Sequence, residues 1–326
     1  MNALIADKFE DAGAAALKEL GLKVTIDPSL KDDALAAAVR DTQCDILVVR
    51  STKVNRAAFT EPGKPALVLR AGSGYDTIDV AAASENGTRV CNCPGMNAVA
   101  VAELTIGLMI ALDRRIVDQT DDLRRGVWNK KEYGKARGLK GRTLGIVGLG
   151  RIGAEVARRA AAFEMQLIYS DVVAMPALER EYGLRRVQFD RLLADADFVT
   201  VHVPGGGETK HLIGAKQLRT MKPTAFVLNC SRGGVIDEKA LTEAVESRTI
   251  AGAALDVYEI EPGATETQFS DPVVNTGRIY GTHHVGASTD QAQLAVADEA
   301  VRVIRAFVES GTFLNCVNPV ETAAHR

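Results

Sequence analysis

Residues 143–160 read TLGIVGLGRIGAEVARRA, an apolar strand followed directly by a glycine turn and an amphipathic helix. Gly148 permits a tight turn, Gly150 lets the main chain approach a ligand, and Gly153 lets the helix pack closely on the strand. The free N–H groups and the dipole at the start of such a helix favour negative charge. The segment therefore predicts a β–α unit of a parallel sheet that holds a dinucleotide pyrophosphate. A purely structural glycine turn is the alternative, because glycine-rich chains contain this spacing by chance.

A carboxylate follows the next predicted strand, residues 166–170, where a dinucleotide-binding fold places its ribose ligand. Asp171 lies about 20 residues beyond the glycine turn, and its carboxylate can accept hydrogen bonds from ribose hydroxyls and repel a 2′-phosphate. Val172 and Val173 bring no arginine that would bind such a phosphate. The sequence thus favours NAD over NADP, the alternative being that Asp171 only caps a turn or a helix.

Strands and helices alternate along the whole chain, as in sheets of parallel strands. Short continuous apolar runs are typical of strands covered on both faces, and they occur at 3–6, 23–26, 45–49, 66–69, 198–203, 225–228, 250–255 and 279–280. A chain of 326 residues exceeds the size at which one core stops growing, so we expect two domains. The predicted fold is α/β, with two doubly wound parallel-sheet domains and an active-site cleft between them.

The predicted domains are unequal. A Rossmann dinucleotide-binding domain, residues 95–289, is inserted in a smaller flavodoxin-like substrate domain made of residues 1–94 and 290–326. Residues 97–112 predict an apolar helix buried on all sides, and residues 290–310 predict a final amphipathic helix.

Composition excludes several classes of partner. A net charge of −3 with 46% hydrophobic residues fits a globular protein and gives no reason to expect nucleic acid. No segment reaches the roughly 18 apolar residues of a membrane span. The five cysteines lie mostly in or beside apolar runs, which favours buried thiols over disulfides or metal ligands, so we expect a cytoplasmic protein without a metal. Charge is uneven only between Arg124 and Arg142, where eight Lys and Arg accompany the single acid Glu132.

Three side chains at the predicted carboxyl ends of strands are candidates for chemistry, because ligands of doubly wound sheets bind there. Arg232 lies in a glycine-flanked loop, where its guanidinium can bind a carboxylate through two hydrogen bonds. Glu261 precedes Pro262, and His284 follows the strand near residues 279–280. Taken singly, these could be a structural ion pair, a solvated loop acid and a hydrogen-bonded loop histidine.

Together the three residue types match the oxidation of a 2-hydroxy acid by hydride transfer. That reaction needs a base for the hydroxyl proton, an anchor for the carboxylate, and an acid that orients the base and raises its pKa. Histidine is the base suited to neutral pH. The neighbours His283 and His284 remain alternatives here, because an extended segment directs only one of them to the same side. His202, His211 and His325 lack such a setting.

The chain at this point resembles the D-isomer-specific 2-hydroxyacid dehydrogenase family over nearly its whole length. The resemblance rests on RSTK at 50–53, RAGSGYD at 70–76, AELT at 102–105, the turn at 148–153, NCSRGG at 229–234, ALDVY at 254–258 and HVGAST at 284–289. It implies that Arg232 binds the substrate carboxylate, that His284 is the acid/base and that Glu261 is its partner. It also selects His284 over His283, which stands where relatives usually have proline, and Tyr75 and Val203 likewise depart from the family pattern.

The resemblance further implies NAD as cofactor, with Asp256 holding the nicotinamide carboxamide. The implied cofactor contacts are Gly148, Gly150, Arg151, Ile152, Gly153, Asp171, His202, Val203, Pro204, Cys230, Ser231, Asp256 and Gly286. The region of residues 97–142 embraces a second subunit in the family, so we expect a homodimer that can pair into a tetramer. The long C-terminal extension of some relatives is absent from this sequence, so we do not expect feedback inhibition by serine.

The substrate tail is predicted from cations near the ends of two strands. Arg50 and Lys53 follow one strand, and Arg70 follows the next, which suggests a phosphate site, the alternative being solvated or ion-paired surface cations. Ser73 and Gly74 are expected to contact substrate from the following loop. The expected reaction is oxidation of D-3-phosphoglycerate to 3-phosphohydroxypyruvate. Reduction of glyoxylate or hydroxypyruvate is the alternative within the family, and an NAD-sensing scaffold similar to its transcriptional corepressors is an alternative outside enzymes.

Overall fold

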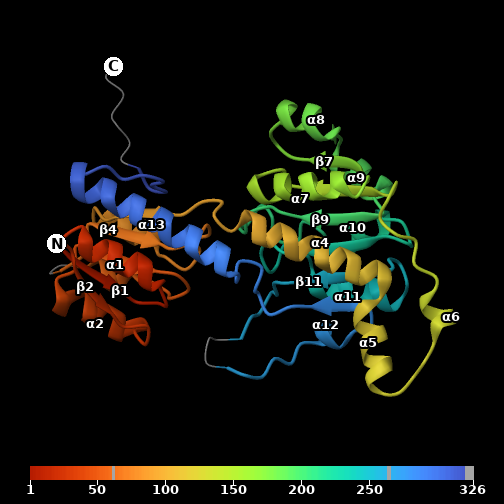
Figure 1. Cartoon of the computed structure of the whole chain (residues 1–326), viewed down its shortest axis with the longest axis horizontal. Helices are drawn as coiled ribbons and strands as arrows, with labels where there is room; N and C mark the ends of the chain where they lie inside the picture. The colour runs from red at the N-terminus through yellow and green to blue at the C-terminus, as the bar shows by residue number, and fades with distance from the viewer. Residues whose placement is uncertain (61–62, 263–265, 320–326) are drawn as a thin grey trace. The chain divides into compact units, whose positions relative to one another are not determined.

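The computed structural model describes residues 1–60, 63–262 and 266–319 and divides into two compact units (Figure 1). Unit 1 consists of Met1–Asn97 with Ser288–Arg326, and unit 2 of Ala98–Ala287. Both units are parallel α/β sheets, which confirms the predicted fold class. No helix in the described ranges combines the length and the apolar character that a membrane span requires.

Unit 1 contains five parallel strands in the order β2-β1-β3-β4-β5, the flavodoxin-like order. The strands are β1 (Asn2–Ile5), β2 (Lys23–Ile26), β3 (Ile46–Val49), β4 (Leu67–Arg70) and β5 (Arg89–Asn92). The helices are α1 (Asp11–Glu19), α2 (Asp32–Thr42), η1 (Arg56–Phe59), α3 (Val80–Glu85) and α13 (Asp290–Ser310). Successive side chains of β1 enter two different cores, Ala3 and Ile5 with α13, and Leu4 with α2, because side chains alternate along a strand. Both faces of the sheet are therefore covered.

Unit 2 contains seven parallel strands in the order β12-β11-β10-β9-β6-β7-β8. The strands are β6 (Thr143–Val147), β7 (Gln166–Ser170), β8 (Arg185–Arg186), β9 (Phe198–Val201), β10 (Phe226–Asn229), β11 (Gly252–Leu255) and β12 (Ile279–Gly281). The helices after the first glycine turn are α7 (Arg151–Ala162), α8 (Pro176–Tyr182), α9 (Phe189–Asp195), α10 (Ala215–Thr220), α11 (Glu238–Glu246) and α12 (Pro272–Asn275). Counted from β6, this is the Rossmann order with a seventh strand added, and the order reverses between β6 and β9, where such sheets bind dinucleotides.

The apolar helix that opens unit 2 corrects one expectation. It spans α4 (Ala98–Arg114) and is not buried on all sides, because Val99, Glu103 and Gly107 are exposed, Val99 to 41%. Residues four apart share a face of a helix, so these three form one open stripe. The opposite face packs into the same core as α7, and Arg159 of α7 reaches Glu103 at 3.1 Å. The apolar composition of α4 therefore did not determine which of its faces are buried. The elements that pack against the helix determine that.

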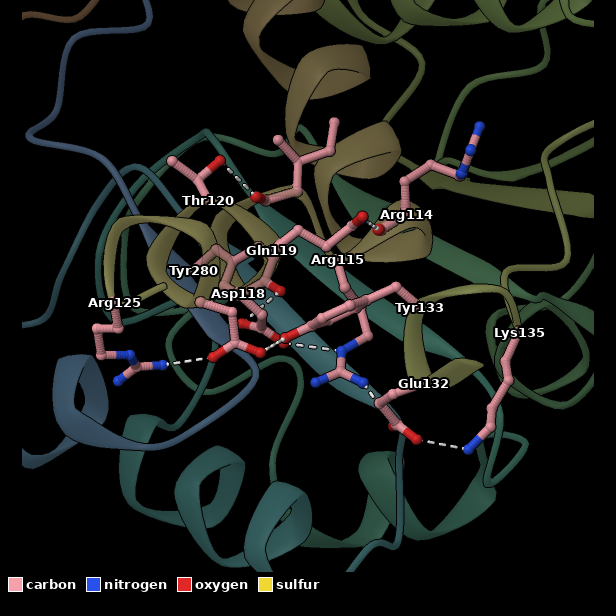
Figure 2. A network of polar contacts seen from close by, with 12 residues as sticks. Arg114, Arg115, Asp118, Gln119, Thr120, Arg125, Glu132, Tyr133, Lys135 and Tyr280 are labelled. Atoms are coloured by element: carbon pink, nitrogen blue, oxygen red, sulfur yellow. Dashed lines mark hydrogen bonds and ion pairs between the residues drawn. The ribbon is translucent and has the colours of Figure 1, made fainter. Parts of the chain in front are cut away.

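The segment after α4 forms an arm held by a polar network (Figure 2). It contains α5 (Ile116–Arg124) and α6 (Lys130–Tyr133). Arg115 donates to Asp118 and to Glu132, each at 2.8 Å, and lies 4.8 Å from the ring centre of Tyr133. The hydroxyl of Tyr280 in β12 donates to Asp118 at 2.9 Å and so ties the arm to the sheet. No residue of α5 is buried.

Candidate active site

Four polar side chains follow the carboxyl ends of four adjacent strands of unit 2. His202 follows β9, Arg232 follows β10, Glu261 lies in the loop after β11, and His284 follows β12. Because these strands are parallel neighbours, their carboxyl ends share one edge of the sheet. The three predicted chemical residues therefore emerge from neighbouring loops of one unit.

His284 and Glu261 are in direct contact. Nδ1 of His284 lies 2.7 Å from Oε2 of Glu261, and the side chains are 49% and 36% exposed. Oε1 of the same carboxylate accepts the N–H of Tyr258 at 3.2 Å, which fixes the orientation of the acid. Because Nδ1 is used, Nε2 is the imidazole nitrogen left to exchange a proton with a ligand.

The contact between His284 and Glu261 shifts the pKa of both side chains. The hydrogen bond with Glu261 is the largest influence on His284 and raises its pKa above the usual histidine value, against burial and the positive charge of Arg232. Burial acts to raise the pKa of Glu261, but the hydrogen bond and charge of His284 outweigh it, and the pKa ends below the usual carboxyl value. The positive charge of Arg232 lowers the pKa of both Glu261 and His284. The structure therefore brings the three predicted residues close to one another.

Arg232 is positioned by its own loop. Its carbonyl accepts from the side-chain amide of Asn229 at 2.9 Å, and Nη1 donates to the carbonyl of Ser231 at 2.8 Å. Gly205 packs against its stem, because a Cβ there would lie 3.2 Å from Cγ of Arg232. The half-buried guanidinium is thus held at the loop surface beside β10.

Asp256 at the end of β11 holds the loop that carries His284. Its carboxylate accepts from the hydroxyl of Thr282 at 2.6 Å and from the N–H groups of Val285 and Gly286 at 2.9 and 2.8 Å. These bonds fix His284 in a left-handed conformation with φ of 52°, which is strained for a residue other than glycine. Sequence reasoning assigned Asp256 only to the cofactor and missed this second task, although the hydroxyl of Thr282 just before the histidine pair was a signal for it.

The glycine turn fits a dinucleotide. Gly148 has φ of 88°, and a Cβ there would lie 2.7 Å from the carbonyl oxygen of His202. A Cβ on Gly153 would lie 2.3 Å from the carbonyl oxygen of Gly148, whereas one on Gly150 would meet nothing within 4 Å. The turn therefore needs glycine at two positions for packing and leaves open space at the third, where Arg151 and Ile152 begin α7.

Asp171 braces the glycine turn and keeps acceptor capacity for a ribose. Its carboxylate accepts the N–H of Leu149 in the glycine turn at 2.7 Å and the N–H of Val173 at 2.9 Å, so it braces the turn. Each carboxylate oxygen has a further lone pair for a ribose hydroxyl. The structure also brings an arginine to this loop, because Nη2 of Arg186 donates to the carbonyls of Asp171 and Val172 at 2.8 and 3.1 Å. Val172 and Val173 themselves bring no arginine, as the sequence indicates, and Arg186 comes from β8, 15 residues further along the chain.

The other predicted cofactor residues line the same edge. Burial lowers the pKa of His202 to about 3, so this histidine is neutral and no candidate acid, and its Nδ1 has no partner among the described residues. Burial raises the pKa of Cys230 to about 12, which leaves a neutral thiol. The hydroxyl of Ser231 donates to Asn229 at 2.8 Å. Val203 is half-buried and Pro204 exposed.

The predicted substrate residues lie in unit 1, at the carboxyl ends of its adjacent strands β3 and β4. Arg50 donates to Gln293 of α13 at 3.1 Å, and Lys53 is exposed. Arg70 is the last residue of β4, and its guanidinium packs directly against Gly72. The hydroxyl of Ser73 donates to Oδ1 of Asn97 at 2.8 Å, and Gly74 next to it is half-buried.

Histidines other than His284 are placed differently. His283 is exposed, and His211 contacts Glu259 at 3.0 Å instead of Glu261. His325 lies outside the described residues. Over the described ranges, no group of three or more His, Cys, Asp or Glu side chains could hold a metal ion.

Comparison with known proteins identifies the family of this arrangement. Residues 106–286 match the family model of the D-isomer specific 2-hydroxyacid dehydrogenase NAD binding domain. The chain is 41% identical to the D-3-phosphoglycerate dehydrogenase of Methanocaldococcus jannaschii over 308 residues, which are 93% of this chain and 57% of that protein. It is 40% identical to the hydroxypyruvate reductase of Thermotoga maritima over 87% of this chain and 90% of that protein.

A solved structure shows the same fold. The glyoxylate reductase from Paecilomyes thermophila superposes with a TM-score of 0.86 at 32% identity, over 97% of this chain and 98% of that one. The chain spans little more than half the length of the D-3-phosphoglycerate dehydrogenases it matches, at 57% and 55% for two of them.

Proposed function

This chain belongs to the family of D-isomer-specific 2-hydroxyacid dehydrogenases, and we propose from that premise that it oxidises D-3-phosphoglycerate to 3-phosphohydroxypyruvate with NAD. The reaction would place it in serine biosynthesis. The observation that carries the proposal is the 2.7 Å contact between His284 and Glu261 in the field of Arg232. An acid-paired histidine and an arginine are the groups that oxidation of an alcohol next to a carboxylate requires.

Each of these residues has a role in the proposed reaction. Arg232 binds the substrate carboxylate and so fixes the carbon that bears the hydroxyl. Nε2 of His284 accepts the hydroxyl proton, and Glu261 stabilises the imidazolium that results. The chemistry that NAD supplies when bound is acceptance of the hydride from the same carbon, so the alcohol loses two electrons and becomes a ketone.

Unit 2 offers the residues that would hold NAD. The turn at 148–153 would bind the pyrophosphate at the start of α7, and Asp171 would bind the adenosine ribose. The remaining contacts would come from His202, Val203, Pro204, Cys230, Ser231, Asp256 and Gly286. Asp256 has already accepted three hydrogen bonds, and a carboxylate with about four acceptor sites keeps room for one carboxamide N–H.

The phosphorylated substrate is supported by the cations of unit 1. Arg50, Lys53 and Arg70 lie at the carboxyl ends of adjacent parallel strands, and the loop with Ser73 and Gly74 follows the second strand. Reduction of glyoxylate or hydroxypyruvate is the second candidate. It is supported by similarity, since the chain is 38% and 40% identical to two such reductases.

Turnover measured over a panel of D-2-hydroxy and 2-oxo acids with NAD and NADH tests the proposal. Preference for 3-phosphoglycerate and 3-phosphohydroxypyruvate over glycerate, glyoxylate and hydroxypyruvate would support it. The reverse preference would replace it with the reductase function, and absence of NADH formation with every acid would refute a dehydrogenase.

A homodimer is part of the proposal, with tetramers formed by pairing of dimers. Apolar side chains are concentrated and exposed on the arm, with Trp128 exposed to 80% and Leu123 to 57%. Exposed apolar area of this kind marks a protein interface. Light scattering at micromolar concentration should give at least twice the chain mass, and Trp128→Asp should give monomers.

A further inference from the structure

Three loops of unit 2 are joined by side chains that the proposed reaction does not use. The loops follow β9, β10 and β11, and they carry the cofactor residues near His202, the anchor Arg232 and the acid Glu261. Two glutamates connect the second loop to the third. Oε1 of Glu238 accepts the N–H of Glu259 at 2.7 Å, and Oε1 of Glu259 accepts the N–H of Glu238 at 3.1 Å.

The two reciprocal hydrogen bonds between Glu238 and Glu259 lie at the start of a helix. Glu238 is the first residue of α11, whose early N–H groups have no partner inside the helix. The carboxylate of Glu259 therefore meets a free N–H and the positive end of the helix dipole. Each glutamate satisfies the main chain of the other, and the bonds fix the separation of the two segments.

His211 adds the first loop to this connection. Its Nε2 lies 3.0 Å from Oε1 of Glu259, and its main-chain N–H donates to the carbonyl of Gly234 at 2.7 Å. It adopts a left-handed conformation with φ of 51°, a strain that the surrounding contacts must offset. Ile213 pairs with Ile236 next to it. All three loops thus meet at Glu238, Glu259 and His211, which we call the clasp.

The clasp lies next to two residues of the proposed site. Glu259 is two positions before Glu261, whose Oε1 accepts the N–H of Tyr258. Gly233, which follows Arg232, packs so closely on Tyr258 that a Cβ would lie 1.7 Å from its carbonyl oxygen. A shift of the third loop would therefore move the acid away from His284 and press on the loop of the arginine.

We propose that the clasp of Glu238, Glu259 and His211 positions Glu261 against His284 and Arg232, so that its three members are positioning residues for the reaction. The inference rests on the proposed function, because it assigns the clasp to the same site. None of the three members touches substrate in this proposal. They act by holding the loops from which the reacting groups project.

The charges around Glu238 make the clasp sensitive to pH. Burial, together with the nearby carboxylates Asp271, Glu259 and Glu261, raises the pKa of Glu238 to about 7, and only the N–H of Glu259 acts to lower it. His211, the member of the clasp from the first loop, contacts Glu259, and Asp237 lies 3.9 Å from its Nδ1. Above neutral pH, Glu238 adds a negative charge close to Glu261, which favours the imidazolium of His284.

Alanine and glutamine variants separate positioning from folding. Glu238→Ala and Glu259→Ala remove the acceptors and should lower kcat by about ten- to a hundredfold, because small displacements of reacting groups have effects of this size. NADH affinity should stay nearly unchanged, since the glycine turn is not involved. Glu238→Gln and Glu259→Gln keep an acceptor oxygen and should retain most of kcat. Glu246→Ala, which removes an exposed carboxylate from the other end of α11, is the matched control.

A second readout needs no substrate. The pKa of His284, followed by NMR in each variant, reports how closely Glu261 approaches it. It should fall in Glu259→Ala and stay in place in Glu246→Ala. Failure of the proposed substrate would leave this result intact, so the two proposals can fail separately.

Two results would overturn the clasp as a positioning device. One is an unchanged kcat and His284 titration in both alanine variants. The other is a parallel loss of kcat and NADH affinity, which would indicate general unfolding of unit 2. If Glu238→Ala does not fold, Glu259→Ala and His211→Ala, whose side chains are more exposed, decide the question by the same two readouts.

Discussion

The sheets of the two units are both parallel and covered by helices on both faces, yet the polar groups at their carboxyl edges are held in different ways. In unit 2, the candidate reacting groups contact one another, as His284 does with Glu261 at 2.7 Å. In unit 1, Asp7 accepts the N–H groups of residues 50, 51 and 52 at 2.6, 3.0 and 3.0 Å and shapes a loop from which Lys53 projects. Unit 2 presents an organised candidate pair for proton transfer, and unit 1 presents cations near a main chain that Asp7 holds in place.

This contrast indicates that substrate chemistry should depend on unit 2 and substrate choice on unit 1. A preorganised pair is costly to disturb and affects every substrate of the enzyme. A cation on a loop matters only to a ligand that carries the matching charge. Substitutions in each unit test this division.

Replacement of the proposed base should have the largest effect. His284→Ala should lower kcat by about 10²- to 10⁴-fold with every substrate, because it removes proton transfer. NADH binding, measured by fluorescence titration, should be retained. The exposed neighbour His283→Ala is the control and should keep nearly full activity. Equal losses in the two variants would contradict the assignment of His284.

Removal of a unit 1 cation should affect only the phosphorylated substrate. Arg50→Ala or Lys53→Ala should raise KM for 3-phosphoglycerate by about 10- to 150-fold, as expected for loss of a charge-assisted hydrogen bond of roughly 1.5–3 kcal/mol. Turnover of glycerate or hydroxypyruvate should hardly change. Arg56→Ala, at a cation of unit 1 that pairs with Glu85, serves as control. If both kinds of substrate suffered equally, the division between the units would be wrong.

Changing the ribose carboxylate should alter the choice of cofactor. Asp171→Asn keeps an oxygen for the N–H of Leu149 but removes the charge, so the NAD to NADP ratio of kcat/KM should fall by about tenfold, the effect of about 1.4 kcal/mol. Asp171→Ala should also weaken NAD, because it releases the glycine turn. Steady-state kinetics with both cofactors would measure this. An unchanged ratio in Asp171→Asn would show that the carboxylate only braces the turn.

The smallest effect is a displacement of the pH profile. Glu261 raises the pKa of His284, and oxidation needs the neutral imidazole, so the oxidation rate rises with pH through that pKa. Glu261→Gln should lower the pKa and move this rise to lower pH. In the reductive direction, which needs the imidazolium, activity should be lost at lower pH than in the wild type. An inflection that stays in place in both directions would count against the pairing.

Much of the local structure could be predicted from the sequence. The apolar pattern predicts the strand Gln166–Ser170 at its observed bounds. The predicted final helix matches α13, whose start Thr289 caps and which Gly311 ends in a left-handed conformation. β5 was missed, since Arg89 and Asn92 frame a run with few apolar residues. Such short strands depend on the neighbours that pair with them.

The candidate site likewise has features that follow from local sequence and features that depend on contacts between distant segments. Patterns in the sequence predicted the glycine turn, the parallel α/β class, the family and the three candidate residues for chemistry, because each depends on spacing within a short segment or on the end of a predicted strand. Three other features are visible only in the folded chain: Arg186 reaches the loop of Asp171, Asp256 holds the histidine loop, and α4 has an open stripe. Those features join segments separated by up to tens of residues, and contacts between such segments are set by packing of the whole unit, which no local pattern encodes.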